Sequence, residues 1–273
     1  MSVGSDLNLE GGTNRMLDLY HNINAVCAQK VRIALAEKGL TAQEHLMTLR
    51  GDQTEPGYLK LNPLGVVPTL LHDGEPIIES SLILYYLEEA FPKPPLMPLA
   101  PLARYRVRLF NKLIDERVHD ACTIMTFAAA FRPKFLAMGR EVWEADIGRS
   151  PSKKRIAYKR DVIEHGLKSP FVTGAVEQFK DLIRQTASAL DQDSYLVGPE
   201  FSMADVAVVP YFVRLELLKM DSLWDKFPSI AGWIVRMRKR PSVNAEIFER
   251  MGAADWAPFE NIQYSPLVGI DVD

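Results

Sequence analysis

The hydrophobic pattern of the first ninety residues alternates between the periods of strands and of helices. Short runs of alternating apolar residues predict strands at 16–20, 44–48, 66–71 and 76–79. Apolar residues at helical spacing predict helices at 26–38 and 82–91, and the span 51–61 has the composition of a loop with one helical turn. The predicted order is strand, helix, strand, loop, strand, strand and helix. This order favours a mixed four-stranded sheet over a doubly wound repeat.

The pattern changes after a proline-rich passage. Five of the ten residues in 92–101 are prolines, a composition that excludes a helix and predicts an interdomain linker. Beyond it, helical periodicity predicts an all-α bundle with helices at 104–131, 173–190, 202–218 and 228–238. The span 139–166 is charged and irregular, and we expect it to be an insertion with a solvent-exposed helix.

These changes predict an α/β domain followed by an all-helical domain. The expected segments are a flexible leader at 1–15, the α/β domain at 16–92, a linker at 93–101, the helical domain at 102–250 and a C-terminal tail at 251–273. A chain of 273 residues is long for one compact core and suits two domains that share an interface.

Composition and charge exclude several classes of function. The formal net charge of -3 offers no dominant basic face, so we expect no nucleic-acid partner. No stretch reaches the roughly 18 apolar residues of a membrane span, and the first residues lack the pattern of a signal peptide. Two distant cysteines, Cys27 and Cys122, predict no disulfide framework and fit a reducing cytoplasm. The five histidines and two cysteines show no metal-ligand spacing, so we expect no metal.

Two motifs in the α/β part predict a site for an extended, anionic peptide. Val67-Pro68 precedes a predicted strand, and an X-Pro bond becomes cis at a cost of only about 0.5–1 kcal/mol relative to trans. A cis bond would turn the backbone groups of Val67 outward, where a peptide could pair with them as with a sheet edge. Glu79-Ser80 begins a predicted helix, whose free N–H groups and positive dipole end favour an anion. Ser80 or Ser81 would cap that helix.

A third motif lies in the helical part. Ser202 and Asp205 have the spacing of an N-terminal capping box, in which two side chains satisfy free N–H groups of the first helical turn. We assign this pair to structure, with the cap contributing about 0.5–2 kcal/mol to stability.

In this order and at this spacing, the three motifs resemble those of the glutathione transferases, and the resemblance extends over about residues 17–248. It implies a thioredoxin-like glutathione-binding domain, a helical domain that supplies the pocket for a small aromatic electrophile, and a cytoplasmic homodimer. It also implies how glutathione, the co-substrate, would bind. The peptide backbone would pair with Val67 beside cis Pro68, the γ-glutamyl carboxylate would rest on Ser80, and the γ-glutamyl ammonium would face Glu79.

The resemblance places activation of the thiol at the junction of the first strand and helix. Cys27 falls in the first helical turn, where the helix dipole can depress a thiol pKa from about 8.5 toward roughly 3.5–7.5. Lys30, one turn later, would add to that effect. Asn22 and Asn24 are further candidates because a side-chain amide can donate a hydrogen bond to a glutathione thiolate. The alternative is that Cys27 is a buried small hydrophobe, as we expect for Cys122.

Two subgroups of the family look most similar to this chain. Bacterial β-etherases, which cleave aryl ethers of lignin-derived aromatics by glutathione attack, share the segments 72–75, 79–80, 86–92, 195–197 and 233–241. The position of their serine corresponds to Ala28, one residue after Cys27. Reductive dehalogenases and maleylacetoacetate-type isomerases have a cysteine near the position of Cys27.

We therefore expect an enzyme whose bound glutathione thiolate attacks an aromatic electrophile, with a β-aryl ether as a candidate substrate. The alternatives are a cysteine-dependent thiol transferase, reductive dehalogenase or cis-trans isomerase, and a non-enzymatic binding module. Arg117 and His119 are polar residues that could contact the substrate. The aromatic-rich stretch expected to line its pocket comprises Phe110, Thr126, Phe127, Phe131 and Phe135.

Overall fold

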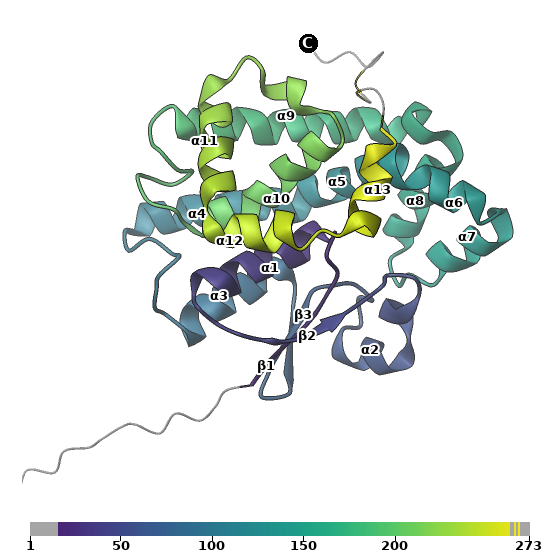
Figure 1. Cartoon of the computed structure of the whole chain (residues 1–273), viewed down its shortest axis with the longest axis horizontal. Coiled ribbons are helices and arrows are strands. Elements are labelled where there is room, and N and C mark those ends of the chain that lie inside the picture. The colour runs from purple at the N-terminus through teal and green to yellow at the C-terminus, as the bar shows by residue number, and fades with distance from the viewer. Residues whose placement is uncertain (1–15, 263–264, 266, 268–273) are drawn as a thin grey trace, which may run out of the picture.

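The computed structural model describes residues 16–262, 265 and 267, so the predicted leader at 1–15 and most of 263–273 lie outside the described residues. A small sheet stands at one end of the molecule and a mass of helices covers it (Figure 1). The first part of the chain forms β1 Leu17–His21, α1 Val26–Glu37, β2 Gln43–Leu46, α2 Pro56–Leu61, β3 Thr69–His72, β4 Glu75–Ile78 and α3 Ser80–Ala90.

The sheet is mixed and four-stranded, as the sequence predicts. Its order is β2-β1-β3-β4. Strand β1 is parallel to β2 and antiparallel to β3, and β3 is antiparallel to β4. Helix α1 packs on α3 and on the helical part of the chain, so the N-terminal turn of α1 lies where the two parts meet (Figure 1).

Local sequence explains where these elements start and stop. Helix α1 ends before Gly39, whose φ of +62° is the left-handed conformation that favours glycine. Asp73 and Gly74 both have positive φ, +52° and +87°, which confirms the predicted tight hairpin between β3 and β4. Strand β3 begins at Thr69, directly after Pro68, because proline has no N–H to give to the ladder.

The start of α3 differs from the prediction. Glu79 is the N-cap residue, and its side chain forms no capping hydrogen bond. The predicted capping by Ser80 or Ser81 is wrong, because both lie inside the helix and both hydroxyls accept hydrogen bonds from Lys30 Nζ, at 3.1 and 2.8 Å. A buried ammonium needs these partners more than the helix needs a cap.

The rest of the described chain is helical. The helices are α4 Pro101–Leu113, α5 His119–Thr126, α6 Arg132–Ala137, α7 Arg140–Gly148, α8 Lys153–His165, α9 Pro170–Leu190, α10 Met203–Leu217, α11 Pro228–Lys239, α12 Pro241–Val243 and α13 Ala253–Glu260. Two wider π-helical segments, Ile114–Val118 and Phe127–Phe131, join α4, α5 and α6 into one continuous path. In the part of the chain that the structure describes, no helix is both long and apolar enough to span a bilayer.

The span 139–166 contains the expected helix with a solvent-exposed face, but it is more regular than predicted. This span forms helices α7 and α8, which project beside α2 as a separate lobe (Figure 1). Three buried residues, Trp143, Ile147 and Ile163, hold the lobe against Phe127 and Phe135. The apolar positions are so few among charged neighbours that the helical period is weak in the sequence.

The segment expected only as a tail contains helix α13. Its first turn contacts the loop between β1 and α1, because Asn24 Nδ2 donates to the backbone carbonyl of Asp255 at 3.1 Å. A helix of only 8 residues, with apolar side chains on several of its faces and a proline inside it, gives little periodic signal, so the sequence pattern did not predict it.

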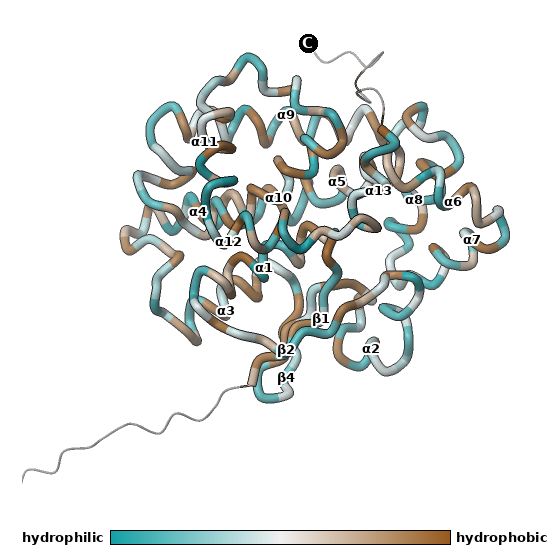
Figure 2. Tube along the Cα trace, in the orientation of Figure 1, coloured by the Kyte–Doolittle hydropathy of each residue, from teal (hydrophilic) through white to brown (hydrophobic). Residues whose placement is uncertain are grey.

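Helix α10 lies at the centre of the helical part. Its residues from Met203 to Leu215 are buried, and hydrophobic positions gather around α10, α1 and the sheet strands (Figure 2). The predicted capping box is confirmed, since Ser202 Oγ accepts from the backbone of α10 and Asp205 Oδ2 accepts from Ser202 N at 3.0 Å. Asp205 also accepts from Trp233 Nε1 at 2.9 Å, which ties α10 to α11.

Candidate active site

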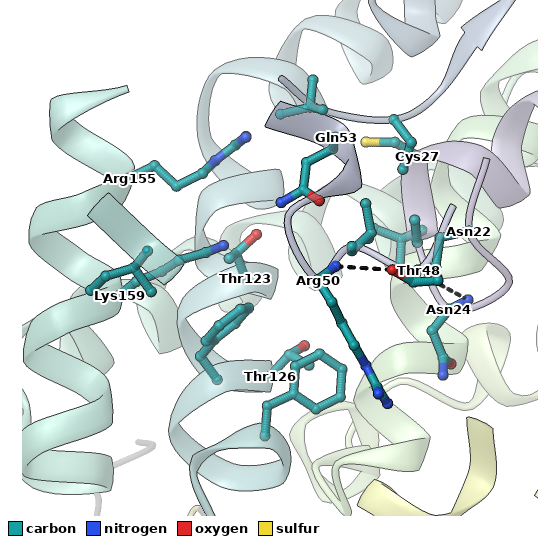
Figure 3. A pocket seen from close by; sticks show the side chains of 18 of the residues that line it. Asn22, Asn24, Cys27, Thr48, Arg50, Gln53, Thr123, Thr126, Arg155 and Lys159 are labelled. Atoms are coloured by element: carbon teal, nitrogen blue, oxygen red, sulfur yellow. Dashed lines mark hydrogen bonds between the residues drawn. The ribbon is translucent and has the colours of Figure 1, made fainter. Parts of the chain in front are cut away.

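A cavity of about 390 Å³ opens where the sheet part meets the helical part. Its walls come from the start of α1, the loops after β2 and before β3, the α5–α6 path, α8 and the start of α13. Figure 3 shows Cys27, Asn22 and Asn24 on one side and Arg155 and Lys159 on the other.

Cys27 lies in the first turn of α1 and faces two polar groups of the helical part. Its Sγ is 3.3 Å from Nδ1 of His119, the first residue of α5. The hydroxyl of Tyr211, from the middle of α10, is 3.7 Å from the same sulfur and 3.2 Å from His119 Nδ1. Three segments far apart in sequence thus converge on one thiol.

The surroundings of Cys27 favour its thiolate. Burial alone would raise the pKa of the thiol, but the charge and hydrogen bond of His119, followed by Lys30 and Ser80, lower that pKa to about 6. Burial opposes the charge on His119, yet the Cys27 thiolate raises the pKa of the imidazole above its usual value. Both shifts favour the form of the pair in which the thiol has lost its proton and the imidazole has gained one.

Tyr211 remains neutral beside this pair. Its side chain is fully buried, and burial followed by the nearby thiolate raises the pKa of the phenol well above its usual value. A neutral phenol can donate its proton in a hydrogen bond to the thiolate or to a neutral imidazole.

The loop before α1 is held by two buried arginines. Arg214 on α10 donates to the backbone carbonyl of Asn24 at 2.5 Å and to Thr126 Oγ1 at 3.1 Å. Arg32 on α1 donates to the carbonyls of Asn22 and Ile23, both at 3.2 Å. These bonds fix the position from which α1 starts.

Asn22 and Asn24 line the cavity, but their amide nitrogens are already bonded. Asn22 Nδ2 donates to the carbonyl of Met47 at 2.8 Å, and Asn22 Oδ1 accepts from the backbone N–H of Asn24 at 3.0 Å. Asn24 Nδ2 donates to Asp255 O and, at 3.3 Å, to Asp255 Oδ1. The two amides hold neighbouring loops together, which favours Cys27 over either asparagine as the reactive group.

The peptide bond between Val67 and Pro68 is cis, as the sequence predicts. Val67 lines the cavity and Pro68 is buried. Among the residues that the structure describes, neither the N–H nor the C=O of Val67 has a hydrogen-bond partner. An extended peptide could therefore pair with this edge.

Glu79 and Ser80 do not line the same cavity. Glu79 is exposed at the start of α3, whereas Ser80 is buried and its hydroxyl accepts from Lys30 Nζ. Lys30 is fully buried and also lies 3.5 Å from Asp115 Oδ1. Its charge helps to lower the pKa of Cys27, in the direction predicted from the sequence.

The remaining candidates divide between the cavity and the core. Thr126, Phe127, Phe131 and Phe135 line the cavity, whereas Phe110 lies elsewhere in the core. Cys122 also lines the cavity, but it is buried as predicted, and burial raises the pKa of its thiol to about 11.

Sequence reasoning underestimated His119 and did not find Tyr211. Both were part of long apolar helices, where a lone polar residue gives no signal of its partner. Arg117, the other polar candidate, points away and pairs with Asp181 at 2.5 Å on the surface. Within the described ranges, no group of histidine, cysteine and acidic residues could hold a metal ion.

Comparisons with known proteins agree with this architecture. Residues 26–90 match the model of the glutathione S-transferase N-terminal domain, and residues 168–241 match that of the C-terminal domain. Maleylacetoacetate isomerase of Mus musculus is 30% identical over 206 residues, which cover 74% of this chain and 80% of that protein. The chain belongs to the glutathione S-transferase family.

Two further family members extend the comparison. Protein LigF of Sphingobium sp. strain SYK-6 is 26% identical over 256 residues, covering 90% of this chain and 98% of LigF. The crystal structure of beta-etherase LigF superposes with a TM-score of 0.76 at 24% identity, over 86% of this chain and 100% of that one. A glutathione S-transferase from Methylobacillus flagellatus KT was solved with glutathione bound. It superposes with a TM-score of 0.58 at 25% identity, over 84% of this chain and 98% of that one. Glutathione is the co-substrate of this family.

Proposed function

We propose that this transferase works by cysteine-dependent thiol transfer, with Cys27 as the nucleophile and a glutathione conjugate of an aromatic compound as the substrate. The observation behind the proposal is the 3.3 Å contact between Cys27 Sγ and His119 Nδ1. A thiolate whose pKa is about 6 is largely ionised at neutral pH and is a competent nucleophile.

The reaction balances with glutathione as the only reductant. The Cys27 thiolate attacks the sulfur of the conjugate R–S–G, the R–S bond breaks, and the carbon leaves with the electron pair. His119 gives its proton to that carbon, so R–H and the mixed disulfide Cys27–S–S–G are formed. A second glutathione thiol attacks the mixed disulfide, releases oxidised glutathione and restores the thiolate–imidazolium pair.

The cavity fits both parts of such a conjugate. The unpaired backbone groups of Val67 support binding of the glutathione peptide, as the resemblance implies. Three aromatic side chains support binding of the aromatic part, since Phe127 lies 5.5 Å from Phe131 and 5.3 Å from Phe135 between ring centroids. We propose Cys27, Val67 and Pro68 as site residues, with Ser80 acting through Lys30 and Glu79 at the outer edge.

A second candidate is cleavage of a β-aryl ether by the thiolate of glutathione itself. It is favoured by the similarity to LigF over 98% of that protein. In this reaction Cys27 would not be a nucleophile, and its negative charge would oppose a second thiolate beside it.

The variant Cys27→Ser separates the two reactions. Thiol transfer predicts that the variant loses release of oxidised glutathione from an S-phenacylglutathione conjugate. Ether cleavage predicts that it retains cleavage of a phenacyl aryl ether. Cys122→Ala is the matched control, because Cys122 is buried and its pKa of about 11 leaves the thiol protonated.

We also propose a cytoplasmic homodimer with the domain division at 16–92 and 102–250, as the family resemblance implies. Sedimentation equilibrium of the purified protein tests the dimer, and a mass equal to one chain at micromolar concentration would contradict it.

A further inference from the structure

The cavity wall has a charge opposite to that of the whole chain. The chain has a formal net charge of -3, yet the cavity is lined by five cationic side chains and two acidic ones. The cationic residues are Arg50, Lys134, Arg155, Lys159 and Arg214, and the acidic residues are Asp146 and Asp255. A positive cleft in an acidic protein concentrates anions at that site.

The two acids offset this positive charge only in part, because the carboxylate of Asp146 acts on Lys134 and Lys159 without forming an ion pair with either. Asp146 pairs with Arg149 at 2.5 Å. Asp255 accepts from the backbone N–H of Gly252 at 3.1 Å and from Asn24, as part of the capping of α13. No ion pair joins Arg50, Lys134, Arg155 or Lys159 to a carboxylate among the described residues.

Arg155 and Lys159 place two positive charges close together on the cavity wall. They are one turn apart on α8 and extend toward the cavity, on the side opposite Cys27 (Figure 3). Lys159 Nζ lies 4.4 Å from the centre of the Phe127 ring. Burial and then repulsion by Arg155 lower the pKa of Lys159 to about 8. Two like charges at this spacing destabilise a helix unless an anion lies between them.

We propose that Arg155 and Lys159 bind the carboxylate of the aromatic substrate, which makes the substrate class an aromatic acid. The ring of such an acid would pack beside Phe127, whose own ring already lies under the ammonium of Lys159, and against Phe131 and Phe135. This inference rests on the proposed function only in placing the aromatic substrate in this cavity, and it holds for thiol transfer and for ether cleavage alike.

Glutathione also has carboxylates, but α8 is poorly placed for them. Val67, with its free backbone groups, lines the same cavity, and Arg50 and Gln53, from the segment after β2, lie between Cys27 and α8 in the view of Figure 3. A carboxylate of glutathione bound along Val67 would meet Arg50 and Gln53 rather than helix α8.

The test is equilibrium binding to the full-length protein, so it does not depend on turnover. The probes are 2-naphthoate, 2-naphthalenemethanol and reduced glutathione, each titrated by calorimetry. The double variant Arg155→Gln, Lys159→Met should weaken binding of 2-naphthoate by about tenfold or more. Binding of 2-naphthalenemethanol and of reduced glutathione should stay unchanged. The matched control is Lys153→Met, which replaces an exposed lysine at the start of α8. The charge-conserving double variant Arg155→Lys, Lys159→Arg should bind 2-naphthoate as the wild-type protein does.

Three results would overturn the proposal. The first is that wild-type protein binds 2-naphthoate no more tightly than 2-naphthalenemethanol, and the second is that the double variant weakens binding of both probes equally. The third is that the double variant weakens binding of glutathione alone, which would assign these cations to the co-substrate. If Cys27→Ser retained thiol transfer while the naphthoate result held, the proposed reaction would fail and the acid subsite would stand.

Discussion

Cys27 Sγ and His119 Nδ1 lie 3.3 Å apart, although 92 positions separate them in the sequence. The contact joins the first turn of α1 in the α/β part to the first residue of α5 in the helical part. Reactivity of the thiol therefore depends on how the two parts pack. Neither part alone supplies a thiolate–imidazolium pair.

The first prediction concerns the pH dependence of Cys27. A thiol pKa lowered to about 6 means that the reactive thiolate predominates above pH 6 and is lost as pH falls through that value. The rate of alkylation by iodoacetamide should therefore be half-maximal near pH 6. In His119→Gln the midpoint should move upward, because the charge that most lowers the pKa is gone. An unchanged midpoint would show that His119 does not stabilise the thiolate.

The second prediction concerns the hydroxyl of Tyr211. Tyr211→Phe removes one donor from the Cys27–His119 pair while conserving the volume of a fully buried ring. We expect a higher thiol pKa for Cys27 and a loss of stability of about 1 kcal/mol. The pH profile of alkylation and urea unfolding measure the two effects. A variant with an unchanged thiol pKa would reduce Tyr211 to a packing role.

The third prediction compares two buried lysines, Lys30 inside α1 and Lys38, the C-cap residue of the same helix. Lys30 lies near the thiol, whereas Lys38 at the other end bonds to the carbonyls of Phe91 and Pro94, at 2.8 and 3.0 Å, and to Glu88. Both Lys30→Met and Lys38→Met should lower stability by about 1–3 kcal/mol, because each leaves buried polar partners unsatisfied. Only Lys30→Met should raise the pKa of Cys27. Equal effects on that pKa would contradict the local account.

The fourth prediction separates two roles for Asn24. Its amide nitrogen donates to Asp255, so Asn24→Ala should loosen α13 and speed amide hydrogen exchange there, with little effect on the alkylation rate of Cys27. If the amide instead holds a glutathione thiolate, turnover would fall while exchange in α13 stayed the same.

Much of the fold follows from sequence patterns that act locally. The hairpin at Asp73 and Gly74 and the capping box at Ser202 are each specified by residues close together in the chain, and the strands and helices of the mixed sheet follow from the local period of each segment. The position of Cys27 in the first turn of α1 is likewise local. These features could be predicted because period, turn chemistry and capping act over a few residues.

Features that depend on tertiary packing could not be predicted in this way. His119 and Tyr211 become partners of Cys27 only when α5 and α10 pack near the start of α1. No local sequence pattern indicates these contacts. For the α7–α8 lobe the sequence predicts one solvent-exposed helix but neither the second helix nor the packing, because only a few apolar residues among many charged ones hold the lobe in place. Its charges become informative only once α8 is seen to line the cavity.

The most direct test of the nucleophilic role of Cys27 is a single-turnover reaction with S-phenacylglutathione, stopped by acid and analysed by peptide mass spectrometry. We predict one glutathione attached by a disulfide to the peptide that contains Cys27, with none on the peptide that contains Cys122. The adduct should disappear on adding reduced glutathione and should not form in Cys27→Ser. Turnover of the conjugate by Cys27→Ser at the wild-type rate would contradict a cysteine nucleophile.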